Sequence, residues 1–277
     1  TGVKDTAGNA LSSQYDNSTG FTTTSSSSSS PKSGVFVIVG EYGTILKSTD
    51  NGSTFSSVAS PTTNIIGGIA YGNGNFIGVG ANWTDYSNQI MISTNNASSF
   101  DNVTFTASSY LNQVAFGNDT FVAVGGSGTI ARSTDNGLSW SAATSGVTST
   151  LKDIAFDNDT FVAVGVSGIV LRSTDNGSSW SAASDSGSET SLDLLSIDSG
   201  NGLWLAVGKL SIILSSTDNG NNWDTVSSPN SIWNQQAFFG NDIFLVGQRD
   251  GGLLRSTDNA TSFSSVTSGI SVHFEGL

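Results

Sequence analysis

The chain has 277 residues, of which 22 are acidic and 9 are lysine or arginine, so its formal net charge is −13. Such a charge repels phosphate groups, which excludes a nucleic-acid partner and disfavours an anionic membrane surface. Cysteine is absent, so disulfides, thiolate catalysis and cysteine-ligated metals are excluded. No apolar run approaches the ~20 residues that insertion across a bilayer requires.

Residues 1–24 form the first segment, which reads TGVKDTAGNALSSQYDNSTGFTTT. Its V-x-D-x-AGN-x-L phrase and its FTT ending resemble the closing segment of bacterial Ig-like domains in surface-layer and adhesin proteins. An unrelated polar tail is the alternative. One or two strands cannot fold alone, so the resemblance implies that the rest of the sandwich lies upstream or that another chain completes it by self-assembly. The serine-rich residues 25–33 are predicted to be a flexible linker.

Residues 34–277 carry a repeat with a period near 40 residues. Its clearest element is the octet Ser-Thr-Asp-Asn-Gly-x-x-Trp/Phe, which occurs six times and begins at Ser48, Ser93, Ser133, Ser173, Ser216 and Ser256. An apolar run that ends in glycine, such as FVAVG at 121–125, precedes each octet. Four short strands separated by turn residues fit each repeat, and units of this size are typical of the blades of a β-propeller.

Counting residues predicts how the ring closes. The aromatic residue of the octet precedes the first strand of the next repeat by 14 residues in most repeats, and the same offset from Phe263 reaches Leu277. The first repeat begins at its second strand with Val35, so His273–Leu277 is predicted to supply the missing strand. The sequence therefore predicts an all-β fold with a six-bladed propeller. A seven-bladed ring that is truncated here, with blades beyond Leu277, is the alternative.

The octet resembles the Asp-box, or BNR repeat, of known propellers. Its acidic or amide side chain is expected to accept backbone hydrogen bonds and fix a hairpin turn. These structural residues are Asp50, Asn95, Asp135, Asp175, Asp218 and Asp258. Alanine replaces the octet glycine at Ala97 and Ala260, so those two hairpins are expected to be less regular. One turn per blade spreads the carboxylates around the ring, which argues against a shared metal or catalytic site.

Asp-box propellers occur in sialidases, xyloglucan-degrading glycosidases, sortilin-type receptors and photosystem II assembly factors, and the VG-x-x-G-T-I-x-x-STDNG-x-x-W phrasing resembles the last of these. A sialidase requires three converging arginines. Here Arg132, Arg172 and Arg255 share one repeat position, so a sialidase is rejected. We expect no catalytic residue, no metal and no cofactor, and we predict that the chain is not an enzyme.

The face that carries the loops between the second and third strands, and those between blades, is the expected ligand surface. Its irregular loops hold exposed aromatic and charged residues that suit sugar rings or a protein partner. The candidates for ligand binding are Glu41, Tyr42, Trp83, Tyr86, Tyr110, Lys209, Trp233, Arg249 and Asp250. For Trp83, anchoring of its own loop is the alternative.

The leading functional prediction is a non-catalytic extracellular module of a multidomain cell-surface or secreted protein, which binds a glycan or a protein. The abundance of Ser, Thr, Asn and Gly and the Ig-like resemblance favour that location. One alternative is a polysaccharide-degrading glycosidase on the same scaffold, which would need two facing carboxylates. The other is an assembly factor that binds a protein partner, as the resemblance to the photosystem II factors implies.

Overall fold

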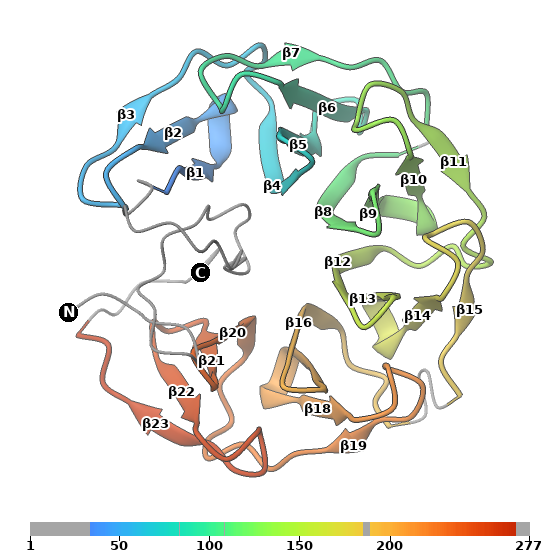
Figure 1. Cartoon of the computed structure of the whole chain (residues 1–277). Coiled ribbons are helices and arrows are strands. Elements are labelled where there is room, and N and C mark those ends of the chain that lie inside the picture. Colours follow the sequence, from blue (N-terminus) through green and yellow to red (C-terminus); the bar gives the residue numbers. More distant parts are fainter. Residues whose placement is uncertain (1–33, 83, 108, 185–188, 270–277) are drawn as a thin grey trace, which may run out of the picture.

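The computed structural model describes residues 34–82, 84–107, 109–184 and 189–269. They form six antiparallel sheets around a central axis (Figure 1), one with three strands and five with four. The prediction of an all-β, six-bladed propeller is confirmed. The Ig-like segment, the linker, Trp83 and the closing strand His273–Leu277 lie outside the described residues, so those interpretations stay predictions.

The blades follow one another along the chain, and each is numbered by its order in the sequence. Blade 1 comprises β1 (Phe36–Val39), β2 (Ile45–Ser48) and β3 (Ser56–Ser57). Blade 2 comprises β4 (Ile65–Gly72), β5 (Asn75–Ala81), β6 (Asn88–Ser93) and β7 (Asp101–Asn102). Blade 3 comprises β8 (Leu111–Gly117), β9 (Thr120–Gly125), β10 (Ile130–Ser133) and β11 (Ser141–Ala143).

The remaining blades repeat the same order. Blade 4 comprises β12 (Leu151–Asp157), β13 (Thr160–Gly165), β14 (Val170–Ser173) and β15 (Ser181–Ala182). Blade 5 comprises β16 (Leu194–Gly200), β17 (Leu203–Gly208), β18 (Ile213–Ser216) and β19 (Asp224–Thr225). Blade 6 comprises β20 (Asn234–Gly240), β21 (Ile243–Gln248), β22 (Leu253–Ser256) and β23 (Ser264–Val266). The first strand of blades 2 to 6 lines the centre of the ring, and the last strand of each blade lies at the rim (Figure 1).

Turn chemistry explains why consecutive strands pair as hairpins. In blade 3 the turn between β8 and β9 holds Asn118 and Asp119 at φ of 47° and 57°. This left-handed pair is the type I′ geometry that matches the twist of an antiparallel hairpin, and Asn and Asp tolerate it. The outermost strands have only two or three residues and are mostly exposed, which leaves little edge for another chain to pair with.

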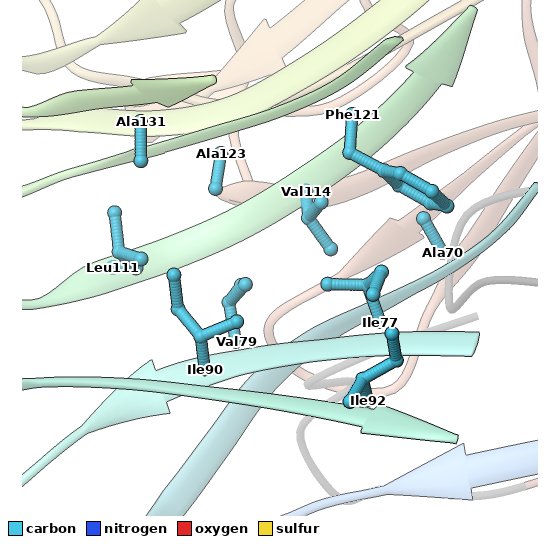
Figure 2. Packing of buried hydrophobic residues seen from close by; sticks show 10 residues of the cluster. All are labelled: Ala70, Ile77, Val79, Ile90, Ile92, Leu111, Val114, Phe121, Ala123 and Ala131. Carbon is cyan, nitrogen blue, oxygen red and sulfur yellow. The ribbon is translucent and has the colours of Figure 1, made fainter. Parts of the chain in front are cut away.

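The hydrophobic core lies between adjacent blades rather than inside any one of them. The second strand is buried on both faces in blades 3, 4 and 5, as its continuous apolar sequence requires. Figure 2 shows one such layer, in which Ile77, Val79 and Ile90 of blade 2 meet Leu111 and Val114 of blade 3. Each blade therefore depends on its neighbour for burial, as in other repeat folds.

Side-chain amides add polar contacts between blades at the turn that joins the first two strands. Asn73 Nδ2 of blade 2 donates to Asp119 Oδ1 of blade 3 at 2.9 Å and to Asn136 Oδ1 at 3.0 Å. Asn118 Nδ2 of blade 3 makes the same two contacts with Asp159 and Asn176 of blade 4, at 2.9 and 3.2 Å. We call these contacts the asparagine latches. Asn158 of blade 4 and Asn201 of blade 5 each make one such contact, to Asn219 and Asp242, so the latches of blades 2 to 5 run to the next blade along the chain.

Candidate functional site

The Asp-box carboxylates are engaged inside their own hairpins. In blade 1, Asp50 Oδ1 accepts from Ser48 Oγ at 2.6 Å and from the Thr54 backbone N–H at 2.9 Å, while Asp50 Oδ2 accepts from Thr54 Oγ1 at 2.6 Å. Hydrogen bonds from the Ser48 and Thr54 side chains lower the pKa of Asp50 to about 2. The equivalent bonds recur in blade 3, where Asp135 accepts from Ser133 and Ser139. Each box therefore stabilises its own hairpin through hydrogen bonds within that hairpin.

The two boxes with alanine keep the same hairpin, so the expectation of less regular turns is wrong. Ala97 N–H donates to Ser93 Oγ at 2.9 Å, as Gly137 N–H donates to Ser133 Oγ at 2.9 Å in blade 3. Ala97 takes the left-handed φ of 54° and is fully buried. Its methyl group belongs to the core between blades 1 and 2, which compensates for the backbone strain.

The arginines that precede the boxes hold neighbouring blades together. Arg132 Nε donates to the Asn176 carbonyl of blade 4 at 2.5 Å, and Arg172 Nε donates to the Asn219 carbonyl of blade 5 at 2.7 Å. Arg255 is exposed on blade 6. The three side chains therefore belong to different blades and do not form a clamp for a substrate carboxylate.

The loops of interest share one face, because in blades 3 to 6 the loop between the second and third strands bonds to the loop that leads into its own blade. Lys209 N–H donates to the Asp193 carbonyl at 3.0 Å, and Arg249 N–H donates to the Trp233 carbonyl at 2.9 Å. We call this surface the loop face. Four of its loops contain a single 3-10 turn: Glu41–Gly43, Gly126–Gly128, Val166–Gly168 and Lys209–Ser211.

Four of the predicted ligand residues meet on this face between blades 5 and 6. Lys209 Nζ lies 5.2 Å, and Arg249 Cζ 4.6 Å, from the centre of the Trp233 ring. Ile232, Trp233, Arg249 and Asp250 line a pocket of about 340 Å³. We call Lys209, Ile232, Trp233, Arg249 and Asp250 the Trp233 cluster. A cation over an indole face is a favourable pair.

The two cations of the Trp233 cluster differ in how they are compensated. Lys209 Nζ forms an ion pair with Asp193 Oδ2 at 2.6 Å. The hydrogen bond from Lys209 lowers the pKa of Asp193, which also accepts from the Ser167 N–H at 3.0 Å. Arg249 is exposed, and no ion pair joins it to a carboxylate among the described residues. A guanidinium held against an aromatic ring can bind a carboxylate through two parallel hydrogen bonds.

The other predicted ligand residues lie elsewhere on the loop face. Tyr86 and Tyr110 form a second aromatic pair, with ring centres 6.1 Å apart. Glu41 and Tyr42 belong to the 3-10 turn of blade 1, where Tyr42 is 84% exposed at a φ of 54°. The described residues contain no group of three or more His, Asp or Glu side chains arranged to hold a metal. They also contain no helix with the length and hydropathy of a membrane span.

Sequence reasoning missed Asp193 and Ile232 at this site, and it missed two carboxylates in the inner strands. Asp153 is only 3% exposed and accepts three hydrogen bonds. Asp198 is partly buried and accepts two. The signal that could have found them is a departure from the repeat, because the other inner strands carry neutral residues at both positions.

One family model matches part of the chain. Residues 138–235 match the model described as Photosynthesis system II assembly factor YCF48. This match runs from the box of blade 3 to Gln235 in the first strand of blade 6 and covers less than half of the chain. A search of curated proteins found no match.

Solved structures resemble the whole ring. The structure described as YCF48 bound to D1 peptide is 16% identical, with a TM-score of 0.65 over 83% of this chain and 76% of that chain. YCF48 from Cyanidioschyzon merolae is 14% identical, with a TM-score of 0.66 over 87% and 83%. The computationally designed Ika8 protein is 11% identical, with a TM-score of 0.63 over 88% and 72%. At these identities the likeness demonstrates the fold.

These comparisons correct the leading functional prediction. The extracellular glycan- or protein-binding module is contradicted, because the matching family model and two of the three similar structures carry the name of the photosystem II assembly factor YCF48. The predicted extracellular or cell-surface location is contradicted by the same findings, and nothing supports adhesion or carbohydrate binding. The composition does not indicate the location of the protein, because surface turns favour Ser, Thr and Asn in any compartment. The prediction that the chain is not an enzyme is confirmed, because the matching family consists of assembly factors.

Proposed function

We propose that this chain is an assembly factor of the YCF48 type that binds a segment of a partner protein on its loop face. The observation that carries the proposal is the Trp233 cluster, in which the Trp233 ring contacts two cations beside a pocket of about 340 Å³. Aromatic and arginine side chains are the residues that most often dominate protein interfaces. The family match reaches into this cluster, because it ends two residues beyond Trp233.

Charge supports a partner segment that brings a carboxylate to Arg249. The protein as a whole repels acidic molecules, since its net charge is −13. Arg249 and Lys209 are therefore a local exception, and Lys209 already has Asp193 as its partner. An acidic side chain or a chain terminus placed at Arg249 would form a charge-assisted hydrogen bond next to an apolar ring.

Leu210 extends the apolar part of this surface. It follows Lys209 in the 3-10 turn of blade 5, is 59% exposed and has a φ of 51°. Blades 3 and 4 have Ser127 and Ser167 at the equivalent left-handed position. A bulky residue in this conformation costs roughly 1–2 kcal/mol. Because the exposed Leu210 side chain adds nothing to the core, a contact with a partner is the natural reason for its presence.

The experiment is a binding titration with two probes. A labelled D1 peptide, the ligand that the similar YCF48 structure names, is titrated first by fluorescence anisotropy. A displayed library of random peptide segments is then selected on the wild-type protein and screened against Trp233→Ala and Arg249→Ala. We expect binders whose affinity falls at least about tenfold in both variants, since hot-spot truncations cost about 2 kcal/mol or more.

Arg255→Ala is the matched control, because it removes an exposed arginine from the same blade and changes the net charge equally. Binding should be unchanged in this variant. If no selected segment distinguishes the wild-type protein from Trp233→Ala, the loop face is not the binding surface and the proposal is wrong.

A further inference from the structure

Blade 6 departs from the other blades where its first strand pairs with the end of its second strand. In blades 2 to 5 a buried apolar residue lies across the sheet from a glycine: Ile66 from Gly80, Leu111 from Gly125, Leu151 from Gly165 and Leu194 from Gly208. In blade 6 the same two positions hold Asn234 and Gln248. Both side chains are almost completely buried, with 0% and 1% exposure. Among blades 2 to 6, only blade 6 therefore buries two amides in place of this apolar pair.

The glycine of blades 2 to 5 allows a close approach of the backbone. A Cβ atom built on any of these four glycines would lie 1.9–2.2 Å from the carbonyl oxygen of the residue that precedes the paired apolar residue. Because Gln248 has a Cβ atom, the equivalent carbonyl of Trp233 lies farther from the second strand in blade 6. This carbonyl still accepts the Arg249 N–H at 2.9 Å. The exchange of glycine for Gln248 therefore changes the backbone path at Trp233 and keeps its bond to Arg249.

The loop that follows Gln248 also has a turn of its own. In blade 5 the Ile212 N–H donates to the Lys209 carbonyl at 3.2 Å, which closes the 3-10 turn. In blade 6 the Gly251 N–H donates to the Gln248 carbonyl at 3.0 Å, so the turn closes one residue earlier in the loop. Gly251 takes a φ of 86°, which glycine adopts without strain. The loop that carries Arg249 therefore follows a different path from the loop that carries Lys209.

Gln248 lies at the centre of a network of side-chain amides. Its Oε1 atom accepts from Asn230 Nδ2 at 2.9 Å, and its Nε2 atom donates to Asn230 Oδ1 at 2.9 Å. The same Nε2 atom donates to Asn234 Oδ1 at 2.9 Å. Asn230 Oδ1 also accepts the Ile232 N–H at 3.1 Å. We call Asn230, Asn234 and Gln248 the amide network. All three amide oxygens have a donor, so their burial avoids the penalty of an unpaired polar group.

The amide network reaches both loops that carry the cations of the Trp233 cluster. Gln248 directly precedes Arg249 in the chain, and Asn234 directly follows Trp233. Asn234 Nδ2 donates to the Ile212 carbonyl at 3.2 Å, and Ile212 closes the 3-10 turn of blade 5. The network therefore holds the backbone beside the arginine, beside the indole ring and at the end of the turn that contains the lysine.

We infer that the amide network positions Arg249, so that its guanidinium lies over the Trp233 ring before a partner binds. Four blades fold with an apolar residue and a glycine at this junction, so the fold itself does not require the amides. A fully bonded polar network holds one arrangement, because any other leaves a buried amide without its partner. A side chain that is already in place does not have to be ordered on binding, which strengthens binding. The effect on affinity rests on the proposed function, whereas the position of Arg249 is a property of the free protein.

Nuclear magnetic resonance of the free protein tests this position. In protein labelled with isotopic arginine, the variant Arg249→Lys identifies the Cδ protons of Arg249. The ring current of Trp233 should place these protons upfield of those of Arg255, which is exposed on the same blade. Trp233→Ala should abolish the difference, which shows that the indole ring causes it.

A double variant replaces the network with the pair that other blades use. Asn234→Leu with Gln248→Gly installs the leucine and glycine of blades 3 to 5, so the protein should fold with a melting temperature close to that of wild type. The Cδ protons of Arg249 should move towards the position of Arg255. The affinity for a peptide segment selected on the wild-type protein should fall about two- to tenfold, as expected when one long side chain must be ordered on binding.

A single variant makes the same test without altering the strands. Asn230→Thr installs the residue that blade 5 has at the equivalent position, where Thr190 Oγ1 accepts the Leu192 N–H at 2.9 Å. The hydroxyl can therefore still bind the Ile232 N–H, as Asn230 Oδ1 does, while the two bonds to Gln248 are lost. The Arg249 protons should shift in this variant too. If the double variant does not fold, Asn230→Thr decides the question.

Gln89→Ala is the control, because it breaks the amide pair of Asn64 and Gln89 on blade 2 and leaves blade 6 intact. The Arg249 protons should not move in this protein. If they also keep their wild-type position in Asn230→Thr and in the folded double variant, the amide network does not position Arg249 and the inference is wrong. In that case, binding that still depends on Trp233 would leave the proposed function standing. Shifted Arg249 protons in a protein that binds no segment would support the positioning and contradict the proposed function alone.

Discussion

The guanidinium of Arg249 lies over the indole ring of Trp233, with Arg249 Cζ 4.6 Å from the ring centre. Because Arg249 is exposed and contributes little to the core, its replacement should separate binding from stability. We expect Arg249→Lys to leave the free energy of unfolding within about 1 kcal/mol of wild type. Its affinity for a carboxylate-bearing segment should fall several-fold, because an ammonium lacks the planar fork of a guanidinium. Urea denaturation and a peptide titration measure the two effects, and a large loss of stability would assign Arg249 to the fold instead.

The boxes should behave as independent local stabilisers. Asp135→Ala removes the acceptor for Ser133 Oγ, the Ser139 N–H and Ser139 Oγ. We expect a loss of about 1–2 kcal/mol in the free energy of unfolding, measured with urea. Asp135→Asn should lose less, because Asn95 already serves blade 2 with the same acceptor atom. Equal losses for the two variants would mean that the charge, rather than the acceptor geometry, stabilises the turn.

The octet glycines should differ in how they tolerate a methyl group. Gly177 has a φ of 75°, and a Cβ atom there would lie 2.6 Å from Val122 Cγ2 of the preceding blade. Gly177→Ala should therefore lower the free energy of unfolding by about 2 kcal/mol or more, through overpacking and backbone strain together. Gly52→Ala is the control, since Gly52 is also an octet glycine and has a φ of 78° but open space around its Cβ position. Equal melting temperatures for the two variants would show that strain alone decides the cost.

The carboxylates of the boxes and the buried Asp153 should change the stability of the protein in opposite directions as the pH rises. Side-chain hydrogen bonds from Ser262 and Ser256 lower the pKa of Asp258 to about 2, as Ser48 and Thr54 do for Asp50. The stability from these boxes is present above the ordinary pKa of 3.8 and is lost as the pH falls towards 2. Burial raises the pKa of Asp153 to about 6, so its contribution is lost as the pH rises through that value, and the melting temperature should be highest at about pH 4–5. A maximum at neutral pH, measured by calorimetry, would contradict the raised pKa of Asp153, and an unchanged melting temperature between about pH 4 and about pH 2 would contradict the lowered pKa of the boxes.

The sequence predicted the six-bladed fold well because every repeat contains the same turn residues and the same apolar strand. The boxes, the Asn-rich turns and the apolar second strands each specify one hairpin, and stacking such units leaves few alternatives. The loop face was predicted only in part. Lys209 and Arg249 are 40 residues apart, and their meeting over Trp233 depends on the rotation between blades 5 and 6.

The carboxylates of the inner strands were not predicted, because strand periodicity assigns each residue to a face without stating how closely neighbouring blades approach. Asp153 looked like an ordinary polar residue in LKDIAF, yet it is almost completely buried against β16. The compartment was predicted wrongly for a different reason. Composition reports what the surface turns require, and it carries no information about the partner that the protein meets.

The asparagine latches give the ring a direction. Asn73 reaches forward to Asp119, Asn118 reaches forward to Asp159, and Arg132 reaches forward to the Asn176 carbonyl. During synthesis, when the amino-terminal parts of a chain emerge first, each of these donors leaves the ribosome about one repeat before its acceptor. A blade that has just emerged is thus completed by the blade that follows it. We therefore expect the blades to be completed in chain order, so that a defect in one blade first affects the blade made before it.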